Sequence, residues 1–193
     1  MSDAAADQLF LGRQPILDRE QRLHAYELLF RSGSRNFAEV TDGVQATATV
    51  IANAFSELGI EAALGSHRGF INVDEAFLFS DMLELLPRHA VVLEILETVP
   101  PTPAVVERCA ALKAAGFTLA LDDVIQLEPE FADLLALVEI VKVDIQPLSR
   151  VQLMQLVMKL KPLGKQLLAE KVDSREQMEQ CQKLGFSLFQ GYY

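Results

Sequence analysis

Several features that mark particular classes of protein are missing from this sequence. Only two cysteines are present, Cys109 and Cys181, and they show no Cys-x-x-Cys pair or zinc-type spacing. We interpret both as reduced core residues of a cytoplasmic protein. No run reaches the roughly 18 apolar residues of a membrane span, and residues 1–7 lack the basic and apolar regions of a signal peptide. We expect residues 1–7 to form a disordered lead-in.

Basic residues are also scarce, with 17 Lys and Arg against 27 Asp and Glu and a formal net charge of −10. A nucleic-acid duplex is bound through a basic surface, so DNA is not an expected partner. The excess of carboxylates is explained either by an acidic, solvated surface or by a cation that neutralises clustered carboxylates. The 193 residues, half of them hydrophobic, suffice for one domain with a substantial core.

A glycine-rich phosphate-binding turn is missing as well, which argues against a Rossmann-type sheet. Apolar runs at 9–16 and 23–30, joined by a polar turn, predict an antiparallel hairpin. Beyond them, strand-like and helical segments alternate, which predicts a parallel sheet covered by helices. We therefore expect the α/β class and a TIM-like (β/α)8 barrel with an antiparallel strand near the N-terminus. The further strands are expected at 69–73, 90–96, 117–121, 139–143, 166–169 and 188–190, and the helices at 41–58, 74–86, 104–115, 130–137, 147–160 and 174–184.

Acidic and amide residues stand where the apolar runs end. A lone carboxylate in such a place costs several kcal/mol, by order of magnitude, unless it is paired or binds a cation. Because the strands of a barrel converge at their C-terminal ends, we expect these side chains to form one charged site. Oxygen ligands suit hard cations such as Mg²⁺ or Mn²⁺, whereas the three histidines lie in turns or beside arginine and are not expected to be ligands. The series is Glu27, Asn72, Glu94, Asp122, Asp123, Asp144, Glu170 and Gln190.

The adjacent carboxylates Asp122 and Asp123 indicate a site for two metals, because one carboxylate can bridge both ions while its neighbour binds the second. Lys142 and Asp144 are two residues apart on a strand and therefore face the same side. In that position Lys142 can neutralise charge or steady an attacking water. A Schiff-base role for Lys142 is disfavoured, since nearby carboxylates keep its ammonium protonated. Taken singly, Glu97, Asp144 and Asp173 are explained as well by salt bridges or solvation at the barrel ends as by a role in the site.

Together these motifs resemble the EAL domain family, the bacterial cyclic di-GMP phosphodiesterases, over nearly the whole chain. The segment Tyr26-Glu27-Leu28-Leu29-Phe30-Arg31 is similar to the family signature Tyr-Glu-Ala-Leu-x-Arg. Seven further segments resemble family motifs, and all eight stand in the family's order. These segments are Gln14-Pro15-Ile16, Ile71-Asn72-Val73, Glu94-Ile95-Leu96-Glu97, Leu121-Asp122-Asp123, Lys142-Val143-Asp144, Ala169-Glu170-Lys171-Val172-Asp173 and Gln190-Gly191-Tyr192.

The resemblance implies an EAL-type barrel over residues 8–193, with Mg²⁺ or Mn²⁺ as cofactor and cyclic di-GMP as ligand. It implies a first metal held by Glu27, Asn72, Glu94 and Asp122, and a second held by Asp122 and Asp123. In the family, the residues matching Lys142 and Glu170 orient the attacking water, and the residue matching Gln190 lies close to it. Substrate contacts are implied for Gln14, Arg31, Asp144 and Asp173, and support of the loop after Asp123 is implied for Glu97.

The loop after the aspartate pair departs from the family pattern. The family reads Asp-Asp-Phe-Gly-Thr-Gly-Tyr-Ser-Ser, and residues 122–129 read Asp-Asp-Val-Ile-Gln-Leu-Glu-Pro. The β-branched Val124 and Ile125 resist backbone conformations that glycine permits, so we expect a rebuilt loop. Smaller departures are Leu28 for the EAL alanine, Lys171 for the glycine after the glutamate, and the shortened Asp173. Changes around metal ligands commonly cost roughly 10–100-fold in affinity or activity.

This loop resembles that of EAL domains followed by an HDOD domain, a branch in which the barrel is often catalytically degraded. We therefore expect a regulatory domain cut from a longer protein that continues into an HDOD domain. It would act through a protein partner or bound cyclic di-GMP, with little or no hydrolysis. The alternatives are an active metal-dependent phosphodiesterase that yields the linear dinucleotide pGpG, and an interaction scaffold with an empty pocket. A homodimer is left open.

Overall fold

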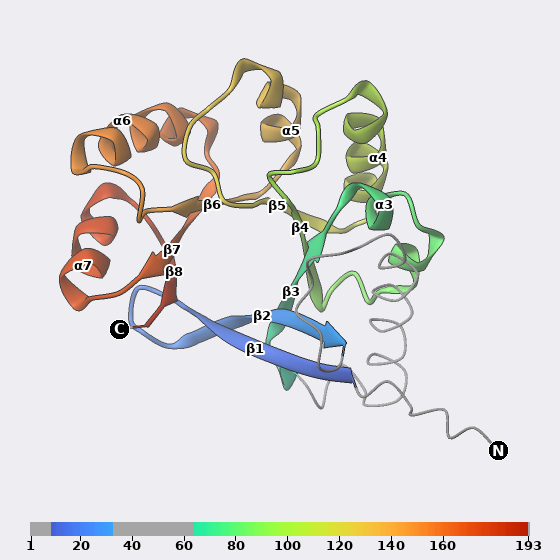
Figure 1. Ribbon diagram of the computed structural model, residues 1–193, viewed down its shortest axis with the longest axis horizontal. Helices are drawn as coiled ribbons and strands as arrows, with labels where there is room; N and C mark the ends of the chain where they lie inside the picture. The colour runs from blue at the N-terminus through green and yellow to red at the C-terminus, as the bar shows by residue number, and fades with distance from the viewer. Residues whose placement is uncertain (1–8, 33–63, 193) are drawn as a thin grey trace.

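The computed structural model describes residues 9–32 and 64–192, and these form a closed barrel of eight strands surrounded by helices (Figure 1). Strand β1 (Leu9–Leu17) pairs antiparallel with β2 (Leu23–Ser32) and with β8 (Leu188–Gly191). The pairs from β2 round to β8 are parallel. The predicted barrel with an antiparallel strand near the N-terminus is therefore confirmed.

The remaining elements follow in alternation along the described chain. The strands are β3 (Arg68–Val73), β4 (Val91–Ile95), β5 (Thr118–Leu121), β6 (Ile140–Asp144) and β7 (Gln166–Val172). The α-helices are α3 (Glu75–Leu78), α4 (Pro103–Ala114), α5 (Ala132–Leu137), α6 (Arg150–Leu160) and α7 (Arg175–Leu184). The 3-10 helices are η1 (Asp81–Leu85), η2 (Pro129–Phe131) and η3 (Lys161–Leu163). The lead-in expected at 1–7 and the helix expected at 41–58 lie outside the described residues.

Capping residues explain two differences between the expected and observed helices. The segment 74–86, expected to be mostly helix, consists of two short helices, because Asp74 caps α3 and Ser80 caps a separate 3-10 helix that begins at Asp81. Helix α6 begins at Arg150, later than expected, because Ser149 and Gln152 form a capping box. The backbone N–H of each of these two residues donates to the side chain of the other. A cap of this kind stabilises a helix by about 1 kcal/mol and so defines where it begins.

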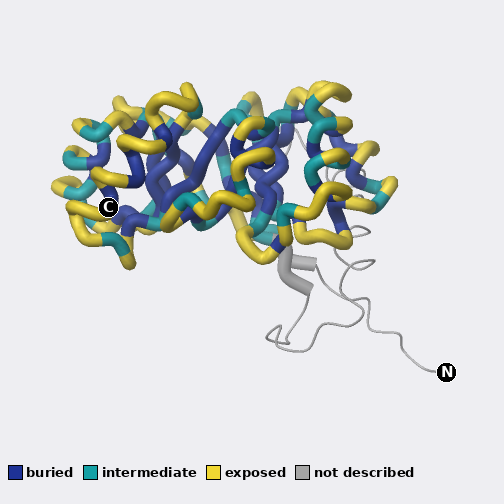
Figure 2. The backbone as a smooth tube through the Cα atoms, turned by 90° about the horizontal axis from the view of Figure 1, so that it is seen from above, coloured by how far each residue is buried: buried dark blue, intermediate teal, exposed yellow. Residues whose placement is uncertain are grey.

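The barrel has two apolar layers, one between the strands and the helices and one inside the strands. Figure 2 shows the buried strands between more exposed helices. The inner layer takes one residue from each strand, and all eight are buried: Ile16, Ala25, Phe70, Val92, Ala120, Ile140, Leu168 and Leu188. This layer fills the barrel, as in other eight-stranded barrels, so ligands can be reached only at the mouth. No helix among the described residues is long and apolar enough to cross a membrane.

The two cysteines lie in helices and are almost fully buried, Cys109 in α4 and Cys181 in α7. Burial raises the pKa of each thiol to about 11. We expect neither thiol to react with a thiol-specific reagent such as DTNB in the native protein at neutral pH, because the reactive thiolate is scarce and covered. Both should react at once in denaturant. Rapid labelling of either cysteine in the native state would contradict this placement.

Candidate metal and nucleotide site

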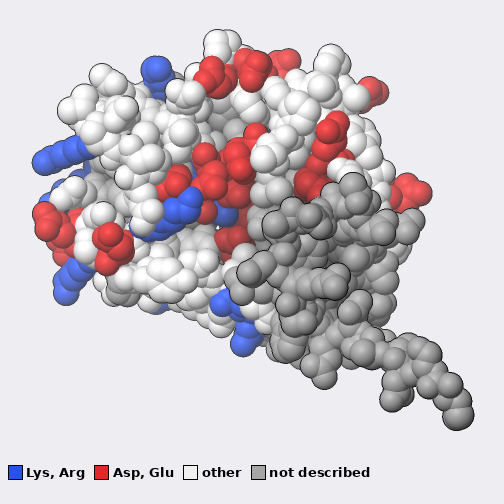
Figure 3. All heavy atoms as spheres, in the orientation of Figure 1, with Lys and Arg blue, Asp and Glu red and all other residues white. Residues whose placement is uncertain are grey.

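A polar ring lies directly above the inner apolar layer. In a strand, residues two apart face the same side, so each polar residue stands two positions from a residue of the inner layer, toward the mouth. The eight members, one on each strand or at its end, are Gln14, Glu27, Asn72, Glu94, Asp122, Lys142, Glu170 and Gln190. The alternation of each strand therefore brings together side chains that are far apart in the sequence. Figure 3 shows acidic side chains gathered near the middle of this face, with basic side chains beside them.

Lys142 is the centre of the ring. Its side chain is 1% exposed, and its Nζ lies 2.7 Å from Glu94 Oε1, 2.7 Å from Asp122 Oδ1 and 3.0 Å from Glu170 Oε1. Glu27 Oε2 is slightly farther away, at 3.5 Å. Burial opposes the charge of the ammonium, but the surrounding carboxylates outweigh burial and raise the pKa of Lys142 well above its usual range. Lys142 is therefore a permanent cation within the ring.

The carboxylates respond to the same burial with the opposite sign. Burial raises the pKa of Glu94 well above its usual range, although Lys142 acts against this. Burial also raises the pKa of Asp122, and it raises the pKa of Glu170 to about 7. The ring places four carboxyl groups around one lysine, and burial disfavours their ionised forms, so a further cation would favour ionisation and bind there.

Glu27 is fixed by amide groups on both sides of it. Gln190 Nε2 donates to Glu27 Oε2 at 2.5 Å, and Asn72 Nδ2 donates to Glu27 Oε1 at 3.3 Å. Gln14 lies opposite Glu27 in the β1–β2 pairing. Gln190 and Asn72 therefore each donate an N–H group to the Glu27 carboxylate, which leaves their side-chain carbonyl oxygens for another partner.

The donor set fits a hard cation. Four buried oxygens have neither a hydrogen-bond partner nor an ion pair among the described residues, and an unsatisfied buried acceptor is expensive unless it meets a cation or water. All four are amide or carboxylate oxygens, the ligands that Mg²⁺ and Mn²⁺ prefer. These oxygens are Asn72 Oδ1, Glu94 Oε2, Glu170 Oε2 and Gln190 Oε1.

A second group of carboxylates lies at the edge of the ring, where β5 ends. Glu97, Asp122 and Asp123 each offer an oxygen, and the three oxygens lie within 4.8 Å of one another. Asp123 is held in the left-handed region, with φ of 46°. A pocket of about 190 Å³ opens beside these carboxylates and is lined by the loop that follows them. Glu97 therefore offers an oxygen to a second cation position, in addition to the loop support implied for it.

The loop after Asp123 is packed into the protein. Val124 is buried, and its backbone N–H donates to the carbonyl of Lys142 at 2.9 Å. Leu127 and Phe131 pack against the same apolar core, and only Ile125 among the loop's large apolar residues is exposed. The loop is thus tied to the barrel by apolar side chains, and the expectation that it has been rebuilt stays a prediction.

Lys171 is the charged residue whose place the sequence pattern does not reveal. Its Nζ lies 2.5 Å from Asp144 Oδ2 and 3.0 Å from Asp123 Oδ1, so it joins the ends of β5 and β6 to β7. Burial opposes the charge of Lys171, but the hydrogen bonds that its ammonium donates to Asp144 and Asp123 outweigh burial and raise its pKa. The feature of the sequence that could have drawn attention to Lys171 is its place directly after Glu170, where the family has glycine.

The remaining predicted residues lie at the rim or outside the described side chains. Asp144 accepts a hydrogen bond from the backbone N–H of Gln146 at 2.9 Å. Asp173 follows β7 with an exposed side chain. Arg31 lies in β2, and its side chain lies outside the described part of the chain. The substrate roles of these residues stay predictions.

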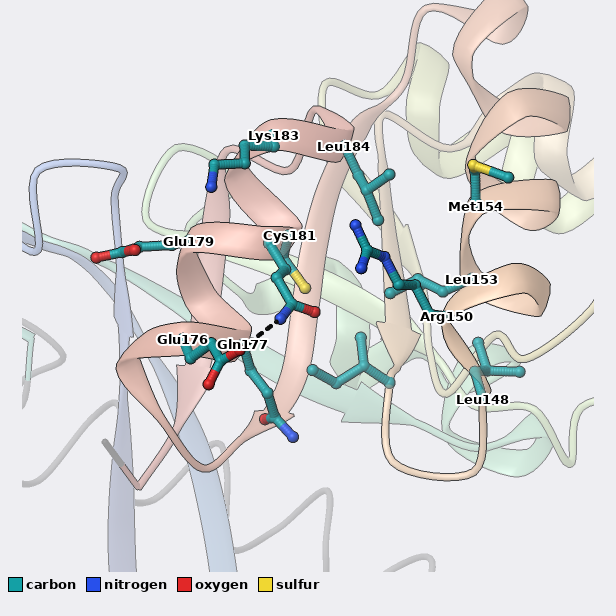
Figure 4. Close-up of a pocket in the computed structure, with 12 residues that line it drawn as sticks. Leu148, Arg150, Leu153, Met154, Glu176, Gln177, Glu179, Cys181, Lys183 and Leu184 are labelled. Atoms are coloured by element: carbon teal, nitrogen blue, oxygen red, sulfur yellow. Dashed lines mark hydrogen bonds between the residues drawn. The ribbon is translucent and has the colours of Figure 1, made fainter.

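A groove of about 520 Å³ lies elsewhere, between α6 and α7 (Figure 4). Leu153 and Met154 of α6 face Leu184 of α7 across it, and Gln180 Nε2 donates to Glu176 Oε1 at its edge. No residue of the polar ring lines this groove. The candidate site for metal and nucleotide is therefore the polar ring at the mouth of the barrel.

Comparisons with known proteins show which proteins this chain is similar to. Residues 2–193 match the family described as the EAL domain. The chain is 37% identical over 190 residues to the uncharacterized protein YuxH of Bacillus subtilis (strain 168), covering 96% of the chain and 46% of YuxH. It is 36% identical over 187 residues to the cyclic di-GMP phosphodiesterase CdgJ of Vibrio cholerae, covering 95% of the chain and 43% of CdgJ. The chain thus spans less than half the length of both relatives.

Solved structures share the fold at lower sequence identity. The phosphodiesterase PaMucR, in complex with c-di-GMP, has a TM-score of 0.78 at 20% identity, covering 95% of this chain and 94% of that one. BlrP1 of Klebsiella pneumoniae, with calcium and cyclic di-GMP, has a TM-score of 0.77 at 22% identity, covering 100% of this chain and 57% of that one. The manganese complex of BlrP1 has a TM-score of 0.75 at 24% identity, with coverages of 97% and 57%.

Proposed function

This chain belongs to the EAL domain family, and from that premise we propose that it is a regulatory domain that binds cyclic di-GMP and hydrolyses it slowly or not at all. The observation that carries the proposal is the packed loop after Asp123. Val124 is buried and hydrogen-bonded to the backbone of β6, which leaves the loop little freedom to close over a ligand. Loop closure is what completes many catalytic sites and excludes water from them.

Nucleotide and metal binding are supported by the intact polar ring. Glu27, Asn72, Glu94 and Asp122 would hold the first Mg²⁺ or Mn²⁺, and Asp122 and Asp123 the second. When bound, such a metal pair supplies charge stabilisation for a phosphodiester and lowers the pKa of a bound water. Among the chain's own groups, Lys142 and Glu170 would orient that water, and Gln190 keeps Glu27 in place through its hydrogen bond at 2.5 Å.

Active hydrolysis is a second candidate, because two observations favour it. All eight members of the ring retain the residue types of the family pattern and lie at the mouth of one barrel. CdgJ, which is 36% identical to this chain, is named a cyclic di-GMP phosphodiesterase. Measured turnover decides between the two candidates, since both require the nucleotide to bind.

The deciding experiment incubates the full-length protein with cyclic di-GMP and Mn²⁺ and measures the linear dinucleotide by chromatography. We expect nucleotide binding by calorimetry and little product. Replacing residues 124–127 by the family's Phe-Gly-Thr-Gly segment should raise the rate at least about 10-fold, because it restores a mobile loop. Rapid turnover by the unaltered protein that Glu27→Ala abolishes would establish the active phosphodiesterase instead.

Controls separate binding from chemistry. Glu27→Ala removes a ring carboxylate and should abolish any true turnover, so product that persists in this variant comes from a contaminant. An unaltered protein that binds no cyclic di-GMP in the presence of Mn²⁺ or Ca²⁺ would overturn the nucleotide-binding proposal and favour a pure interaction scaffold.

Signalling requires that the bound state be read by another protein surface. We propose that a protein partner or a following HDOD domain reads it, as the resemblance implies, and that this takes place in the cytoplasm. A homodimer is a further arrangement to be tested by light scattering of the full-length protein.

A further inference from the structure

We infer that Lys171 is a tethered cation that takes the position of the second metal ion and leaves the domain with one effective metal site. The inference rests on the proposed function, because it concerns the same mouth of the barrel. Lys171 Nζ contacts Asp123 Oδ1 at 3.0 Å and Asp144 Oδ2 at 2.5 Å. Asp123 is the carboxylate that would belong to the second metal alone, so the ammonium binds the ligand that this ion needs.

The backbone of β7 explains how Lys171 reaches the mouth. Glu170 points into the ring, so its neighbour in a regular strand would point outward. The pairing of β7 with β8 shifts register between Ala169 and Val172, and Lys171 has a left-handed φ of 57°. An irregularity of this kind redirects a side chain. The ammonium therefore lies over the ends of β5 and β6.

Stability does not account for a lysine at this position. A non-glycine residue in the left-handed region is strained, and glycine adopts this conformation without strain. The Lys171 side chain is 44% exposed, and ion pairs at such exposure contribute little to folding. A strained residue that holds two functional carboxylates points to a role at the site.

In this geometry the Lys171 ammonium and a metal ion would compete for Asp123. A divalent ion that binds Asp123 must displace the Lys171 ammonium, which is held by two carboxylates. The carboxylates of the first metal position, Glu27, Glu94 and Asp122, pair with Lys142, whereas Lys171 pairs with Asp123 and Asp144. Lys171 should therefore weaken the second metal and leave the first one unchanged.

Metal binding without nucleotide tests this directly. Mn²⁺ is titrated into the full-length protein by calorimetry, and the bound ions are examined by electron paramagnetic resonance. We expect the unaltered protein to bind one Mn²⁺ well. Lys171→Met should bind a second at least about 10-fold more tightly than the unaltered protein does. Two ions about 3.5–4 Å apart share a carboxylate and show a spin-coupled signal, which a purely structural change would not produce.

Matched variants define the controls. Lys171→Arg keeps the charge and should behave as the unaltered protein does. Lys183→Met removes an exposed cation from the last turn of α7 and should also change nothing. If Lys171→Met does not fold, Lys171→Gly provides the same loss of charge with a backbone that suits the left-handed φ.

Two results overturn the inference. One is a second Mn²⁺ that binds the unaltered protein as tightly as it binds Lys171→Met. The other is metal binding that is the same in both proteins, including no binding in either. Because metal alone is the probe, these outcomes are independent of the nucleotide assay that tests the proposed function.

Discussion

Replacing Lys142 by methionine is expected to lower the free energy of unfolding by about 3–5 kcal/mol in the absence of divalent metal. Lys142 is the cation around which Glu94, Asp122 and Glu170 gather within 3.0 Å, and it is 1% exposed. Methionine keeps most of the volume but leaves these carboxylates buried without a counter-charge. The penalty is a large part of the 5–15 kcal/mol that stabilises an ordinary domain.

Urea unfolding with and without Mn²⁺ measures this effect. Because a bound divalent ion restores positive charge to the ring, Mn²⁺ should recover part of the lost stability in Lys142→Met. The matched control is Lys159→Met on the exposed side of α6, which should change stability by no more than about 0.5 kcal/mol. Equal stability of Lys142→Met and the unaltered protein would show that the ring is already neutralised by protons.

The placement of the ring could be predicted from the sequence because it depends on a local property. Strand alternation puts Glu94 two positions after Val92, and Lys142 two positions after Ile140, on every strand of a barrel in the same way. Closure of the barrel then brings these positions together. The chemical roles of the residues do not follow from this placement and stay predictions.

Two features could not be predicted, because they depend on choices between competing local structures. The sequence predicts that the segment 74–86 is mostly helix, and the caps Asp74 and Ser80 divide it into two short helices. Lys171 reaches the site only through the irregular pairing of β7 with β8 and a left-handed φ. Alternation alone predicts that Lys171 points away from the mouth, so its contact with Asp123 does not follow from the sequence pattern.

Replacing Glu94 by glutamine is expected to weaken metal binding without lowering the free energy of unfolding of the metal-free protein by more than about 1 kcal/mol. Glu94 is fully buried, and burial raises the pKa of its carboxyl well above the usual range, so folding disfavours its ionised form. Glutamine has nearly the same shape without the charge. Lys142 keeps Asp122 and Glu170 as close partners. In metal-free buffer the free energy of unfolding should therefore stay within about 1 kcal/mol of the unaltered protein or rise.

The same substitution should lower the affinity for metal. Glu94→Gln removes a charged oxygen from the first metal position, and Mn²⁺ affinity measured by calorimetry should fall at least about 10–100-fold. Glu97→Gln is the matched control, because Glu97 is exposed and lies with the second group of carboxylates. It should leave the first Mn²⁺ unchanged. An unaltered affinity in Glu94→Gln would remove Glu94 from the ligand set. A large loss of affinity without loss of stability would mean that the protein keeps this buried carboxylate for the cation it binds.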